Sequence, residues 1–152
     1  MGLWDWTLEA YAQPGVPAAC LTLQDDHGQN TSLLLWAVWA EADDARLLDR
    51  AADVARRWES LALTPLRDIR RALKPDFSGV DAGARQGLRE DVKAAELRAE
   101  RVLMEALEGL SKGKGGAHAL TALTAASQAW GEPAPPPPAT RDALAALAAA
   151  LG

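Results

Sequence analysis

The chain has 152 residues, which is enough for one domain with a buried core, and its 49% hydrophobic content excludes a disordered polymer. Its 21 acidic and 16 basic residues give a net charge of -5, which argues against a broad surface for nucleic acid or anionic membranes, because phosphate binding needs positive charge. The single cysteine, Cys20, excludes an internal disulfide and a metal site made only of cysteines.

Alanine is abundant and β-branched residues are scarce, so the composition predicts an all-α fold. A first short helix is expected from residue 5 to residue 11, before Pro14 and Gly15. A second begins at Val16 and Pro17, with proline in the first turn, and ends at Gly28. Residues 33–40 form a third helix that is apolar on every side. Such a helix is surrounded by others, and it is therefore predicted to be the centre of the fold.

Four more helices are predicted at residues 43–60, 64–74, 84–110 and 117–130. The pair Thr64-Pro65 is typical of a helix start, so a separate fifth helix is expected there. The helix over 84–110 carries an apolar stripe that keeps helical period for more than six turns, which predicts one buried face. The glycine-rich residues 112–116 predict a flexible turn after it.

The predicted organisation is a single helical domain over residues 1–131, a bundle of about seven helices around residues 33–40. Residues 132–139 form a proline-rich linker, which is expected to be a semi-rigid spacer without helix. Residues 140–152 form a short C-terminal helix of alanine and leucine. The pattern leaves open whether this helix docks on the bundle or stays mobile.

A stripe of four cations runs along the predicted fifth helix at positions i, i+3, i+4 and i+7. These cations are Arg67, Arg70, Arg71 and Lys74. They repel one another unless anions lie opposite, so the stripe needs a partner. Glu96 and Glu100 on the long helix offer internal Arg–carboxylate pairing, which we favour. The external alternative is a phosphate, a nucleotide or an acidic protein surface.

Asp25, Asp26 and His27 end the second helix and, with Glu96 and Glu100, form a candidate polar site. Carboxylates beside an imidazole can bind a metal or move protons. However, adjacent residues on a helix point about 100° apart, so a polar helix end that turns into the glycine cap is the preferred interpretation. No metal, no cofactor and no catalytic residue is predicted.

Six tryptophans are present. Trp4 and Trp6 are candidate interface residues near the N-terminus, because tryptophan combines a large contact area with one hydrogen-bond donor. The other four are expected to pack in the core. They are Trp36, Trp39, Trp58 and Trp130.

The stretch PGVPAACLTLQDDHG over residues 14–28, followed by Asn30 and the LLLW of residues 33–36, resembles the signature of a bacterial family of conserved hypothetical proteins. That signature reads roughly PGVxxACLxLQDxxG, then a leucine run ending in tryptophan. Residues 65–74 and 92–101 resemble the same family. Ser32 stands where the family has asparagine before the leucine run. The resemblance implies a helical fold, a bacterial source and no known activity.

The hypothesis that fits these patterns best is a non-enzymatic interaction or regulatory module that binds a protein partner or self-associates. The alternative is a small helical enzyme or ligand-binding protein with a carboxylate–arginine site between helices. Contact of the basic stripe with nucleic acid ranks third. The longest apolar run, residues 33–40, is far shorter than the ~20 residues of a membrane span, and the N-terminus lacks a basic, apolar leader. A cytoplasmic protein without membrane contact is therefore expected.

Overall fold

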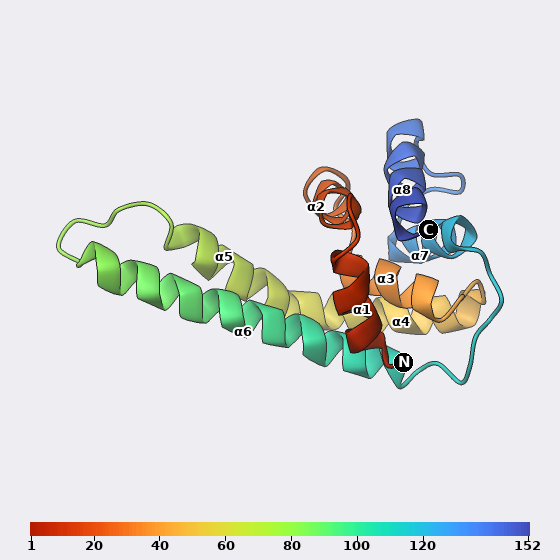
Figure 1. Cartoon of the computed structure of the whole chain (residues 1–152), viewed down its shortest axis with the longest axis horizontal. Coiled ribbons are helices and arrows are strands. Elements are labelled where there is room, and N and C mark those ends of the chain that lie inside the picture. The colour runs from red at the N-terminus through yellow and green to blue at the C-terminus, as the bar shows by residue number, and fades with distance from the viewer.

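The computed structural model describes residues 1–152 and contains eight α-helices and one short π-helical segment, without strands (Figure 1). This confirms the predicted all-α fold. The elements are α1 (Leu3–Tyr11), α2 (Val16–His27), α3 (Thr31–Trp39), α4 (Ala45–Trp58), η1 (Glu59–Leu63), α5 (Thr64–Ala72), α6 (Ala82–Glu108), α7 (Ala119–Trp130) and α8 (Pro138–Leu151). None of these helices has the combination of length and apolarity that crossing a bilayer requires.

Helix α3 lies at the centre of the core, as its apolar sequence predicts. The side chains of residues 33–37 have no exposed surface. Helices α1, α2, α4, α6 and α7 all contact α3, so no side of it needs polar residues. The side chain of Asn30 caps its first turn by accepting a hydrogen bond from the Leu33 N–H at 2.9 Å.

Helices α4 and α5 are parts of one long helix, because η1 joins them without a break (Figure 1). The prediction that Thr64 caps a separate helix is therefore wrong. Leu63 has helical dihedral angles, and no side chain caps the start of α5. Pro65 has no N–H and its ring crowds the preceding turn of an α-helix. The wider π turn just before it relieves this conflict, so the helix continues.

Helix α5 and the first half of α6 form a two-helix arm that projects from the other helices (Figure 1). No residue of α5 is buried, and the buried residues of α6 begin only at Glu96. Leu88, predicted to lie on a buried stripe, is 53% exposed, and Ile69 is 48% exposed. The sequence period is helical here, but each arm helix has only the other to pack against.

Two arginines of α6 fasten the end of α5. Arg85 donates from Nε to the carbonyl of Leu73 at 3.1 Å, and Arg89 donates from Nε to the carbonyl of Arg70 at 3.2 Å. These carbonyls belong to the last turn of α5, where no further residue of the helix can donate to them. Arg85 also pairs with Asp76 in the connecting loop at 2.8 Å. The arm is therefore a defined hairpin rather than two loosely associated helices.

Helix α8 docks on the body against α2 and α7, which answers the question that the sequence leaves open. Thr140, Leu144 and Leu147 are buried, and the two leucines have no exposed surface. The helix begins at Pro138, two residues before the predicted boundary. The expectation that all these prolines are non-helical is wrong at this position, because proline is tolerated in the first turn of a helix.

The glycine-rich loop before α7 is pinned to the end of α3 rather than being a free turn. The N–H of Gly115 donates to the carbonyl of Ala40 at 2.9 Å, and the N–H of Ala117 donates to the carbonyl of Glu41 at 3.0 Å. A Cβ at Gly115 would overlap the Glu41 carbonyl oxygen. The glycine is needed here for close approach of two backbones.

Replacing Gly115 with alanine is expected to lower the free energy of unfolding by about 1–3 kcal/mol, because the loop must move away from Glu41. Urea denaturation followed by circular dichroism measures the change. The matched control is Gly87→Ala in α6, where an added Cβ meets nothing within 4 Å. That variant is expected to gain up to about 1 kcal/mol from helix propensity. Equal effects at both positions would contradict the close approach.

Candidate functional site

The charged side chains of the two arm helices meet where the arm joins the body. Arg70 of α5 donates to Glu96 of α6 from Nε at 2.6 Å and from Nη2 at 3.4 Å. Arg67 lies 3.8 Å from the same carboxylate, and its Nε has no hydrogen-bond acceptor. The exposed fractions of the three side chains are 23% for Arg70, 15% for Arg67 and 11% for Glu96. Internal pairing, the favoured interpretation of the stripe, is present for these two arginines.

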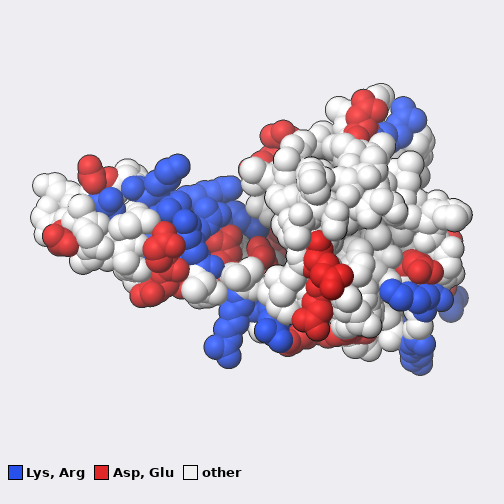
Figure 2. All heavy atoms as spheres, viewed as in Figure 1, with Lys and Arg blue, Asp and Glu red and all other residues white.

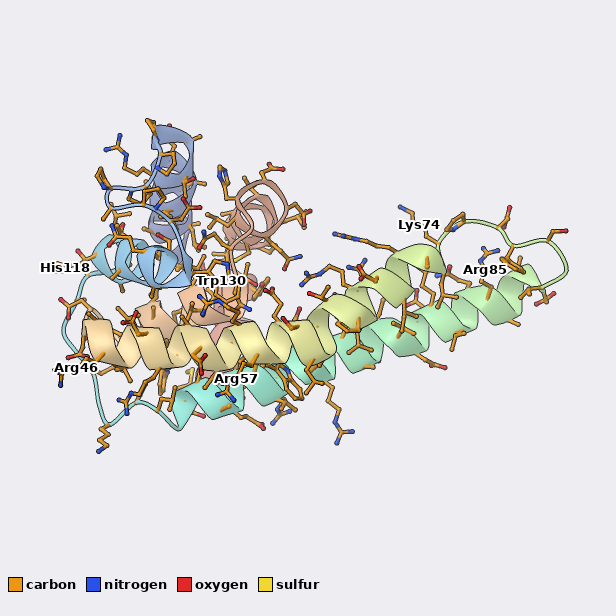
Figure 3. All side chains as sticks on the ribbon, turned by 180° about the vertical axis from the view of Figure 1, so that it is seen from behind. Arg46, Arg57, Lys74, Arg85, His118 and Trp130 are labelled. Atoms are coloured by element: carbon orange, nitrogen blue, oxygen red, sulfur yellow. The ribbon has the colours of Figure 1, made fainter.

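The other two cations of the stripe point toward solvent. Arg71 lies 3.9 Å from Asp25 of α2, and both side chains are substantially exposed, so solvent screens this contact. Lys74 makes no ion pair and lies near the far end of the arm, as does Arg85 (Figure 3). Figure 2 shows blue side chains gathered over the arm from its middle toward the body.

Glu100 lies one helical turn beyond Glu96 and has no ion-pair partner. The pKa of its carboxyl is raised from the usual 4.5 to about 7; burial is the largest cause and the charge of Glu96 adds to it, while Arg67 and Arg70 act in the opposite direction. Glu96 and Glu100 therefore differ in how their charges are balanced. Glu96 is neutralised by two arginines, and Glu100 titrates close to neutral pH.

A cleft of about 170 Å³ opens beside Glu100, between α1, α3 and α6. Trp4 and Tyr11 of α1 line it, together with Thr31 of α3 and with Leu97 and Met104 of α6. Sequence reasoning missed Tyr11 and Thr31. Neither residue belongs to a local motif, and each reaches the cleft only through packing of its helix.

Tyr11 and Cys20 lie side by side near this cleft. Burial raises the pKa of the Cys20 thiol to about 11, so the thiol stays protonated at neutral pH and is a poor nucleophile. Burial is also the largest cause of the raised pKa of Tyr11, with Cys20 and Glu100 adding to it. At neutral pH the Tyr11 hydroxyl and the Cys20 thiol therefore stay protonated, and they act as hydrogen-bonding groups and not as reactive anions.

Glu59 of the π-helical segment is a carboxyl with a raised pKa that sequence reasoning missed. Burial raises its pKa, while Arg67 and the side chain of Asn30 lower it. Glu59 thus brings a third carboxyl to the neighbourhood of Arg67. The π turn directs Glu59 toward Arg67, and this turn is associated with Pro65. Neither the hydrophobic period nor a helix-cap motif in the sequence indicates a π turn.

Asp25, Asp26 and His27 do not converge on one site. Asp25 faces Arg71 of the arm, and Asp26 is exposed without an ion pair. The Nδ1 atom of His27 lies 3.2 Å from the hydroxyl of Thr140 on α8. Gly28 follows in a left-handed conformation and ends the helix. No group of three or more potential metal ligands is present in the chain.

Four of the six tryptophans donate a hydrogen bond to another part of the chain. Trp36 is fully buried and its indole N–H donates to the hydroxyl of Ser111 at 2.9 Å. Three others are half-buried and donate to backbone carbonyls: Trp39 to Met1, Trp58 to Ala99 and Trp130 to Gly28. Trp4 and Trp6, the predicted interface residues, are half-buried and pack against the core. The guanidinium of Arg101 lies 5.5 Å from the centre of the Trp4 ring.

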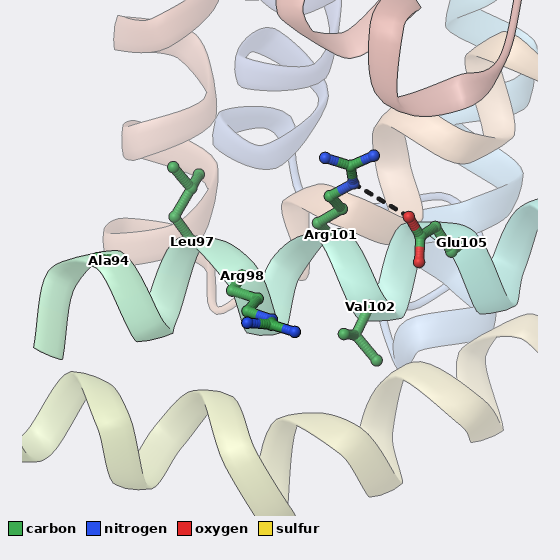
Figure 4. A pocket seen from close by; sticks show the side chains of 6 residues that line it. All are labelled: Ala94, Leu97, Arg98, Arg101, Val102 and Glu105. Carbon is green, nitrogen blue, oxygen red and sulfur yellow. Dashed lines mark hydrogen bonds and ion pairs between the residues drawn. The ribbon is translucent and has the colours of Figure 1, made fainter. Parts of the chain in front are cut away.

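A larger hollow of about 480 Å³ lies along the outer side of α6 (Figure 4). Every residue that lines it comes from this one helix, and two of them, Arg101 and Glu105, pair with each other at 3.0 Å. A surface formed by a single helix cannot enclose a small ligand. The cleft beside Glu100 is therefore the better candidate site.

Replacing Glu100 with glutamine is expected to raise the free energy of unfolding at pH 8 by roughly 1–3 kcal/mol. The pKa of Glu100 in the folded chain, about 7, exceeds the usual 4.5. The folded state therefore holds the proton more tightly, and wild-type stability falls as the pH rises from about 4.5 through 7. Urea denaturation at several pH values should show a gain that shrinks toward pH 5. A gain independent of pH would contradict the raised pKa.

The model of one protein family matches residues 2–107, and this family is described as protein of unknown function (DUF2390). The matched region runs from α1 nearly to the end of α6 and includes the arm and the cleft. No curated protein and no solved structure shows a significant match to the chain.

Proposed function

Since the chain belongs to the DUF2390 family of proteins of unknown function, whose description offers no activity, we propose from its geometry that it is a non-enzymatic interaction module that self-associates. The projecting arm of one copy binds the acidic face of α1 on another. The observation that supports this most strongly is the apolar tip of the arm, which nothing in the chain covers.

The tip of the arm combines apolar residues from both helices and the loop between them. Phe77 is 68% exposed, Leu88 is 53% exposed and Val80 is 49% exposed. With Leu73 they line a hollow of about 430 Å³. Contiguous apolar surface of this kind is uncommon on a monomer unless it binds something. These residues do not pack in the hydrophobic core, because the core does not extend as far as the tip of the arm.

Charge indicates what kind of surface the tip fits. Arg71 and Lys74 are exposed next to the tip, so an acidic surface with an apolar centre is complementary to it. The chain itself offers one on α1. Asp5, Leu8 and Glu9 are exposed at positions i, i+3 and i+4, hence on one side of that helix. Figure 2 shows acidic side chains along the part of the body where α1 lies in Figure 1.

An interface between the arm of one copy and α1 of another is heterologous, because the two surfaces differ. Each copy then keeps one free arm and one free α1 face, so assembly continues beyond a dimer unless a ring closes. The mass measured by light scattering is therefore expected to rise with protein concentration. It should fall as salt is added, because exposed charges attract less strongly at high ionic strength.

Two charge-reversed variants give the sharpest test. Variant one carries Arg71→Glu and Lys74→Glu on the arm, and variant two carries Asp5→Lys and Glu9→Lys on α1. Each alone is expected to be monomeric, because its arm and its α1 face have the same charge. Mixed together, the basic arm of variant two fits the acidic α1 face of variant one, and the acidic arm of variant one fits the basic α1 face of variant two. Light scattering of the mixture should then show restored association in which the two variants alternate and the mass again rises with concentration.

The control replaces apolar residues. Phe77→Ser at the tip is expected to weaken self-association at least tenfold, while Leu120→Ser on α7, where the leucine is 45% exposed, should leave it unchanged. A wild-type chain that stays monomeric at millimolar concentration would overturn the proposal. So would a mixture in which the two charge-reversed variants fail to pair.

Nucleic-acid contact is a weaker candidate for the arm. Arg67 and Arg70, half of the basic stripe, are engaged by Glu96 and are largely buried. Only Lys74 and Arg71, which lies 3.9 Å from Asp25, remain exposed to phosphates, and two cations supply little affinity at physiological salt.

A further inference from the structure

The cleft beside Glu100 has walls from three helices, which distinguishes it from the open hollows elsewhere on the surface. Its volume of about 170 Å³ equals the room taken by roughly six water molecules at about 30 Å³ each. It therefore fits a small organic molecule of a few non-hydrogen atoms and is too small for a nucleotide or a peptide.

The charge balance around the cleft leaves one carboxylate without a partner. Glu96 is neutralised by Arg70 at 2.6 Å, with Arg67 at 3.8 Å. Glu100 receives no such ion pair, although it is the acidic residue that lines the cleft. Glu100 is thus the one charged residue in the lining of the cleft, and its carboxylate makes no ion pair there.

The walls of the cleft suit an apolar body with a positive end. Trp4 and Tyr11 supply aromatic rings, and Leu97 and Met104 supply aliphatic surface. The negative face of an aromatic ring attracts cations. The Trp4 ring already does so, since the guanidinium of Arg101 lies 5.5 Å from its centre.

We propose that this cleft binds a small organic cation, a primary ammonium on a short alkyl chain. Glu100 is its counter-ion, and Trp4 and Tyr11 enclose the chain and the ammonium. The hydroxyl of Thr31, on the α3 side of the cleft, accepts one of the ammonium hydrogens. An anion of the same shape is rejected by the charge of Glu100, and a neutral molecule gains only from the apolar walls.

Three probes of one shape and different charge test this assignment: butylammonium, butan-1-ol and butyrate. Each is titrated into the chain labelled with ¹⁵N, and the indole N–H signals of the six tryptophans are followed by NMR. Butylammonium is expected to shift the Trp4 signal and to bind at least tenfold more tightly than butan-1-ol. The Trp130 signal, whose indole N–H is bonded to Gly28 away from the cleft, serves as the internal control.

Glu100→Gln keeps the shape of the side chain and removes its charge. It is expected to weaken butylammonium binding at least tenfold and to leave butan-1-ol binding unchanged. The matched control is Glu90→Gln on the same helix, an exposed residue outside the cleft, which should leave both affinities unchanged. Equal affinity for all three probes, a preference for butyrate, or full binding by Glu100→Gln would each overturn the assignment.

The pH dependence gives a second readout. The charged groups facing Glu100 are Glu96, Arg67 and Arg70, and the titratable neutral groups nearby are Tyr11 and Cys20. Both neutral groups have pKa values raised by burial and remain protonated below pH 8. Butylammonium affinity should therefore fall between pH 8 and pH 5.5 as Glu100 takes up its proton. Affinity that does not change over this range would contradict the role of Glu100.

The cleft adjoins the α1 face proposed for self-association, because Leu8 belongs to both, so a variant that does not associate must separate the two. The titration is repeated on the arm variant with Arg71→Glu and Lys74→Glu, which leaves the cleft intact and removes the proposed contact between copies. Unchanged butylammonium affinity in that variant supports the cleft by itself, whatever the oligomeric state of the wild-type chain. Loss of affinity there would mean that the cleft forms only between associated copies and would overturn the proposal in this form.

Discussion

Replacing Glu96 with glutamine is expected to lower the free energy of unfolding by about 3 kcal/mol, because it leaves Arg67 and Arg70 without their anion. Both guanidinium groups are largely buried at the base of the arm. The amide can still accept a hydrogen bond from Arg70, but it does not balance the charge. Urea denaturation followed by circular dichroism measures the loss.

The loss should also depend on pH. Glu96 helps to raise the pKa of Glu100, so its removal lets Glu100 ionise more readily and partly take its place. The destabilisation is therefore expected to be smaller at pH 8 than at pH 5.5. The control is Glu105→Gln, which breaks the exposed pair with Arg101 at 3.0 Å and should cost no more than about 1 kcal/mol. Equal losses at positions 96 and 105 would show that the inner pair contributes no more than a surface pair.

Leu147→Ala in the C-terminal helix is expected to lower the free energy of unfolding by about 2–5 kcal/mol. Leu147 has no exposed surface and packs in the same core cluster as the central helix α3. Truncation removes buried apolar contacts and leaves a cavity that the surrounding helices fill only in part. Thermal and urea denaturation report the change, and both should show a single transition if α8 unfolds with the body.

A matched leucine on the surface separates docking from a general effect of the substitution. Leu61 in the π-helical segment is 73% exposed, so Leu61→Ala should change stability by no more than about 0.5 kcal/mol. A mobile C-terminal helix would make Leu147→Ala as mild as Leu61→Ala. That outcome would show that α8 does not contribute to the core.

Several parts of the fold could be predicted from local sequence. The apolar run over residues 33–40 identified the central helix, because such a helix is stable only when other helices surround it. Asp44 caps α4 at the start expected for that helix, whereas α6 begins at Ala82 after its cap Asp81, two residues before the predicted start. The facing charges on two predicted helices suggested the pairing of Arg70 with Glu96, because these side chains match in charge and in spacing.

The predictions that failed are those that depend on what lies beside a helix. The apolar stripe of α6 has the same period along its length, yet Leu88 is exposed where Leu103 is buried. Only the number of neighbouring helices distinguishes the two, and periodicity carries no such information. At Thr64-Pro65 the local signal for a new helix was outweighed by a π turn, which keeps one helix continuous from α4 to α5.

For the candidate sites, the amino-acid sequence specifies which residues are acidic, which are basic and which predicted helix carries each. The role of each charge depends on the side chains that lie opposite, and these are set by the packing of the helices. Packing gave Glu96 two arginines and left Glu100 without a partner beside aromatic side chains from α1. Packing likewise separated Asp25, Asp26 and His27, which are adjacent in the chain and point to different neighbours because of the turn of their helix.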